Sequence, residues 1–123
     1  MAYKVVIQCP DVEDIVKLIK KKHGADYSRV WRIDGRTIGV FSFERSGLVT
    51  QTGYVNLITL DHDRAIENCE ITIIGAGGGR PGLVSLAELG DSGAAPVADL
   101  AKLAKERCWP IHVEVAKIKK KAK

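Results

Sequence analysis

The sequence has no long hydrophobic run, few aromatic residues and only three cysteines. Because no apolar stretch approaches the ~18 residues that a membrane helix needs, we expect no membrane span. The cysteine count is odd and no Cys-x-x-Cys pair occurs, so Cys9, Cys69 and Cys108 are predicted to be reduced thiols. Residues 1–4 lead directly into a strand pattern with no secretory leader, and we therefore expect a cytoplasmic protein.

The aromatic residues are two Trp, three Tyr and two Phe, which are few for a protein that stacks on bases. Positive charge is concentrated instead: the net charge is +4, and five lysines lie in Lys117–Lys123. Weak nucleic-acid binding through this tail is one interpretation. The simpler one, which we favour, is that the lysines keep the protein soluble.

With 123 residues and 46% hydrophobic content, the chain has the size of one globular domain. We expect that domain to span residues 1–118, followed by a basic tail at 119–123. The three histidines are scattered along the chain, so no metal site is predicted.

The most regular pattern is a helix that follows a first strand, Tyr3–Cys9. Apolar residues recur with helical spacing from Val12 to Ile19. Asp11 is the predicted N-cap, lysines fill the last turn, and Gly24 is the predicted stop.

An Asp34-Gly35 pair between two extended segments predicts a hairpin with a type I′ turn. A two-residue loop places Trp31 opposite Ile38. The next predicted strand, Leu48–Leu60, is long, and Gly53 is a possible bulge within it.

The triplet Asp61-His62-Asp63 allows two interpretations. Its side chains are metal-ligand types, but such triplets are more often polar turns, so we predict a turn. In that interpretation Asp61 or Asp63 caps a helical turn through Arg64–Glu67.

The remaining pattern predicts a strand at Glu70–Ile74, a short helix after Ser85, a helix from Pro96 with an apolar stripe that reaches Cys108, and a strand at Ile111–Ile118. The resulting order is β-α-β-β-β-β-α-β. Clustered strands with a helix near each end indicate an α+β fold, with an antiparallel or mixed sheet and the two main helices packed on one face.

A glycine run follows the Glu70–Ile74 strand, with five glycines among the eight residues 75–82. It fails the dinucleotide fingerprint, because Arg80 occupies the third glycine position and no second parallel strand follows at the required distance. Consecutive glycines can still direct several backbone N–H groups at one anion. The predicted ligand-binding residues are Gly77, Gly78, Gly79, Arg80 and Ser85.

We therefore expect a small binding domain that holds an anionic molecule, bearing phosphate or carboxylate, at the Gly75–Gly82 loop. The main alternative is a structural or oligomerisation module, in which the long Leu48–Leu60 strand pairs with a second copy or covers a dimer interface. A homo-oligomer is expected in either case. The sequence identifies no catalytic residue, cofactor or metal, and leaves open whether the protein is an enzyme.

Overall fold

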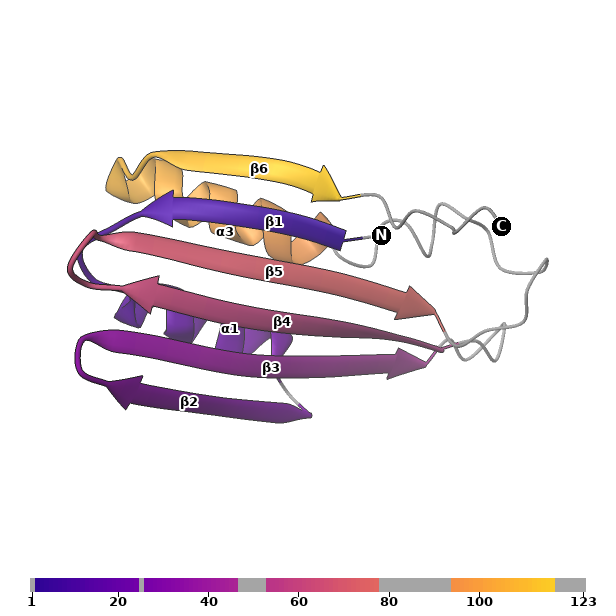
Figure 1. Ribbon diagram of the computed structural model, residues 1–123. Coiled ribbons are helices and arrows are strands. Elements are labelled where there is room, and N and C mark those ends of the chain that lie inside the picture. Colours follow the sequence, from indigo (N-terminus) through magenta and orange to yellow (C-terminus); the bar gives the residue numbers. More distant parts are fainter. Residues whose placement is uncertain (1, 25, 47–52, 78–93, 117–123) are drawn as a thin grey trace, which may run out of the picture.

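The computed structural model of the protein describes residues 2–24, 26–46, 53–77 and 94–116. The protein has an α+β fold, and its elements follow the predicted order (Figure 1). The elements are β1 (Ala2–Gln8), α1 (Glu13–His23), β2 (Tyr27–Ile33), β3 (Arg36–Ser46), β4 (Gly53–Asp63), β5 (Asn68–Gly77), α3 (Ala94–Arg107) and β6 (Ile111–Ala116).

The strands form one antiparallel sheet in the order β2-β3-β4-β5-β1-β6. Strands β2 to β5 follow one another as a meander, whereas β1 lies between β5 and β6. Strand β4 lies between β3 and β5, so both of its edges already have partners. The hypothesis that this strand pairs edge to edge with a second copy is therefore wrong for its described part, whereas residues 48–52 lie outside the described residues. That the strand covers a dimer interface stays a prediction.

Both helices lie behind the same face of the sheet (Figure 1). Side chains from this face and from the two helices form one buried cluster, in which Phe41, Ile58, Ile71 and Leu100 are large members. The opposite face carries the alternate side chains of each strand, and none of the described helices covers it. In the described part of the chain, no helix is long and apolar enough to cross a membrane.

Helix α1 forms as its pattern predicts, with Ile15, Val16 and Ile19 buried against the sheet. The start of α1 differs from the prediction, which made Asp11 the N-cap. Asp11 Oδ1 accepts a hydrogen bond from Glu13 N at 2.9 Å, but Val12 occupies the N-cap position. The Asp11 carboxylate therefore bonds one of the N–H groups left unpaired at the start of the helix, although Asp11 lies one residue before the N-cap.

The predicted hairpin between β2 and β3 is confirmed. Asp34 and Gly35 have φ angles of 47° and 81°, the two positive values that a type I′ turn requires. Trp31 pairs with Ile38, as the two-residue loop dictates.

Strands β4 and β5 extend beyond their predicted ends. The triplet Asp61–Asp63, predicted as a turn, forms the end of β4, and Gly77 pairs with Tyr54 inside the sheet. Gly53 begins an unbroken register with β3, so the predicted bulge is absent there. Pairing with a neighbouring strand outweighs the low strand propensity of Asp and Gly.

The end of α3 also differs from its pattern. Cys108, predicted on the apolar stripe, is exposed and lies beyond the helix with φ of 60°. Trp109 N donates to Ala104 O at 2.8 Å, which is a helix ending that uses a left-handed residue. This reversal brings the chain to Pro110 and β6.

Candidate functional site

The predicted anion site can be placed only in part. Gly77 is the last residue of β5, while Gly78, Gly79, Arg80 and Ser85 lie outside the described residues. The glycine-run site therefore stays a prediction. Strand β5 begins at the β4–β5 turn at one end of the sheet and ends at Gly77, at the other end (Figure 1).

A cleft of about 660 Å³ lies at the end of the sheet where the β2–β3 hairpin and the β4–β5 turn meet the start of α1. Its volume falls within the range of small-molecule sites. Three segments that are distant in sequence form its walls: residues 10–13, 32–37 and 62–67.

Hydrogen bonds fasten these three segments together. Arg64 N donates to Gly35 O at 3.0 Å, which joins the β4–β5 turn to the hairpin. Cys9 N donates to Glu67 O at 3.0 Å, and His62 Nε2 lies 2.9 Å from the carbonyl oxygen of Cys9. The walls of the cleft are therefore held in place without a ligand.

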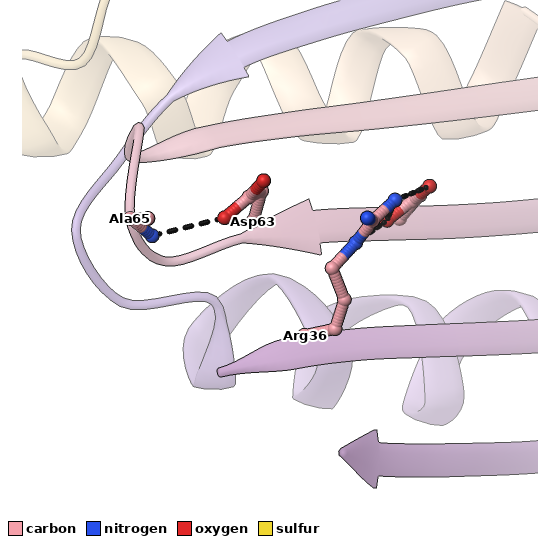
Figure 2. Close-up of polar contacts among 4 residues, drawn as sticks. Arg36, Asp63 and Ala65 are labelled. Carbon is pink, nitrogen blue, oxygen red and sulfur yellow. Dashed lines mark hydrogen bonds and ion pairs between the residues drawn. The ribbon is translucent and has the colours of Figure 1, made fainter. Parts of the chain in front are cut away.

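The β4–β5 turn has its own local support. Asp63 Oδ1 accepts a hydrogen bond from Ala65 N at 3.0 Å (Figure 2), so Asp63, one of the two predicted caps, does cap residues 64–67, but these form a turn and not the predicted helical turn. Glu67 closes the turn with φ of 52°. This hydrogen bond holds the backbone of the turn in place at Arg64, which lines the cleft.

Two buried polar side chains line the cleft, Thr37 from β3 and His62 from β4. They are direct cross-strand partners, and only 8% and 3% of their surfaces are exposed. A carbonyl oxygen can only accept, so the Nε2 atom of His62 carries the proton that is donated to Cys9 O. Within the described residues, no hydrogen bond involves Thr37 Oγ1 or His62 Nδ1. Both atoms are therefore open to a ligand.

Three arginines line the cleft, and two of them are already paired. Arg32 donates to both carboxylate oxygens of Glu13, at 3.1 and 2.7 Å, and this hydrogen bonding raises the pKa of Arg32. Arg36 donates to Asp61 in the same two-atom manner (Figure 2), which raises the pKa of Arg36. Across the described ranges no carboxylate forms an ion pair with Arg64, so its charge is available.

The triplet Asp61-His62-Asp63 cannot hold a metal ion by itself. Strand alternation directs His62 toward the helices and the two aspartates toward the uncovered face. No group of three His, Cys, Asp or Glu side chains suited to a metal occurs among the residues the structure describes.

Sequence reasoning did not find this cleft. Its residues carry no motif, and along the chain His62 stands between two aspartates with no threonine beside it. The available signal was indirect: a histidine and a threonine become partners once the register of the hairpin and of β4 is known.

Comparison with known proteins gives no match, whether to a family model, to a curated protein or to a solved structure.

Proposed function

We propose that the protein is a binding domain for a small molecule with a single carboxylate or phosphate group, held in the cleft at the end of the sheet. The observation that carries this proposal is the pair Thr37 and His62, buried side by side with Oγ1 and Nδ1 unused by the described residues. Neither atom belongs to the fully enclosed side-chain atoms that lack a hydrogen-bond partner, so both can be reached from the cleft. A ligand in the cleft could therefore hydrogen-bond to both.

The charges around the cleft favour a ligand with one negative group over a polyanion. Arg64 is the available cation and can bind a carboxylate or phosphate through two parallel hydrogen bonds. The same cleft is lined by Asp11, Asp34 and Glu67, which would repel the additional charges of a polyphosphate or nucleic acid. These carboxylates can accept hydrogen bonds from hydroxyl or amino groups of the ligand.

Thr37 and His62 make the cleft selective for ligands with hydrogen-bonding groups. Thr37 Oγ1 can donate or accept, whereas in the neutral imidazole with its proton on Nε2 the Nδ1 atom of His62 accepts only. The ligand that fits best therefore carries a donor, such as a hydroxyl or ammonium group, near its anionic group. Hydroxy acids, amino acids and phosphate monoesters of small alcohols belong to this class. A cytoplasmic location, which we retain as part of the proposal, would give access to all three.

Replacing Thr37 with valine is expected to abolish ligand binding without destabilising the unliganded protein. Valine keeps the shape of threonine, and the hydroxyl that it removes has no partner in the described fold, so the free energy of unfolding should change by less than about 1 kcal/mol. Thermal unfolding in the presence of hydroxy acids, amino acids and phosphate monoesters tests this, since a ligand of the native state raises the melting temperature.

The arginine variants give the matched comparison. Arg64→Ala should remove the ligand-induced shift and leave the unliganded melting temperature unchanged, because Arg64 is exposed and unpaired within the described fold. Arg29→Ala removes the same charge from an exposed arginine on the uncovered face, outside the cleft, and should keep the shift. If no member of the panel shifts the wild type, or if Arg64→Ala and Thr37→Val both retain the shift, the proposal is wrong.

A further inference from the structure

Strand β6 is an edge of the sheet with β1 as its one neighbour among the described strands. Gln8 N donates to Pro110 O at 3.0 Å, which fixes the direction of the backbone groups that follow. Since backbone groups alternate along a strand, His112 and Glu114 direct theirs to β1. Ile111, Val113 and Val115 direct their N–H and C=O groups to the open edge. Such an edge is a template for another strand.

We infer that the protein forms a two-fold symmetric dimer in which β6 pairs antiparallel with β6 of a second copy, extending the sheet across both subunits. The symmetry axis would pass through Val113. In this register Val113 faces the partner's Val113, and Ile111 faces the partner's Val115. All three are residues whose backbone groups point outward, so each pair exchanges two hydrogen bonds.

The side chains of β6 are complementary to themselves in the same register. On the uncovered face, His112 lies opposite the partner's Glu114, and Glu114 lies opposite the partner's His112. Within one chain these two side chains already associate, with His112 Nε2 3.1 Å from Glu114 Oε2. On the helix side the facing residues are all apolar, and they include Val113 and Val115, which are 38% and 52% exposed in the single chain. Pairing would cover that apolar surface.

Other registers are worse for this strand. An axis through Glu114 places two carboxylates directly opposite each other, and like charges in that position are destabilising. An axis through His112 places two identical imidazoles together and leaves one fewer hydrogen-bonded pair. The register through Val113 therefore has both the most hydrogen bonds and the best charge match.

The other edge of the sheet, β2, is less suited to a second copy. It carries Arg29 and Arg32, so pairing two β2 strands would bring four guanidinium groups to one seam. Charged residues of one sign are a common protection of edge strands. Strand β6 has no lysine, arginine or proline.

Sedimentation velocity of the full chain over a wide concentration range tests the dimer. The wild type should sediment with twice the mass of the 13.4 kDa chain at high concentration. Val113→Lys sets two ammonium groups opposite each other at the axis and should yield a monomer that remains folded by circular dichroism. Ile38→Lys is the matched control, since Ile38 is also 38% exposed but lies on the uncovered face, and it should remain dimeric.

Exchanging the exposed residues His112 and Glu114 tests the register of the β6–β6 pairing. His112→Glu turns both His112–Glu114 pairs across the interface into pairs of carboxylates. This change should weaken the dimer about tenfold or more. Adding Glu114→His to the same chain restores complementary pairs and should recover the dimer. A wild type that is monomeric at every concentration overturns the inference. So does a dimer that survives Val113→Lys but is lost in Ile38→Lys, which would locate the interface on the uncovered face.

Discussion

Replacing Phe41 with alanine is expected to lower the free energy of unfolding by about 3–5 kcal/mol. Phe41 lies on β3 and is fully buried between the sheet and the helices. Its removal deletes a large apolar surface and leaves a cavity that the surrounding strands cannot close. Urea denaturation of the wild type and the variant measures the difference. Phe43, on the same face of the same strand but only half-buried, gives the matched control, and Phe43→Ala should cost clearly less.

Gly39 explains how the Phe41 ring fits. A Cβ atom at residue 39 would lie 2.7 and 2.9 Å from two ring atoms of Phe41, closer than carbon atoms can approach. In the wild type, Gly39→Ala is therefore expected to destabilise the protein by about 1–3 kcal/mol through overpacking. In the Phe41→Ala background the same change should be neutral or stabilising, because the ring is absent and alanine restricts the unfolded chain. Equal costs in both backgrounds would contradict this packing account.

Raising the pH above about 8.5 is expected to destabilise the protein through the buried thiol of Cys69. A hydrogen bond with Cys9, burial and nearby carboxylates raise the pKa of the Cys69 thiol. The unfolded chain releases this proton near the ordinary thiol pKa of about 8.5, whereas the folded protein keeps it. The stabilisation is therefore complete below about pH 8.5. It is lost progressively as the pH rises toward the higher pKa of the folded state.

Chemical denaturation at neutral and alkaline pH measures this effect. Lysine and tyrosine also titrate in alkali, so the informative quantity is the difference between variants. Cys69→Ala should show a shallower loss of stability with pH than the wild type. Cys108→Ala removes an exposed thiol and should follow the wild type. If all three proteins lose stability in parallel, the buried thiol does not contribute as argued.

Local features of the fold were predictable wherever neighbouring residues in the chain decide the structure. The α1 helix follows from apolar spacing, and the β2–β3 register follows from Asp34-Gly35, because a two-residue loop leaves no freedom in the pairing. The ends of β4 and β5 were not predictable in this way. Residues such as Asp63 and Gly77 form strand because a neighbouring strand pairs with them, and single-residue propensity contains no information about that neighbour.

By itself, the sequence determined the α+β class, the order of the elements, the first helix and the type I′ hairpin. Each of these depends on interactions within a few residues. The position of β1 between β5 and β6, the opposition of Thr37 and His62, and the place of β6 at the edge of the described sheet were decided only by the tertiary structure. They join segments that lie far apart in the chain, and they depend on which strands become neighbours when one face of the sheet is buried beneath the helices.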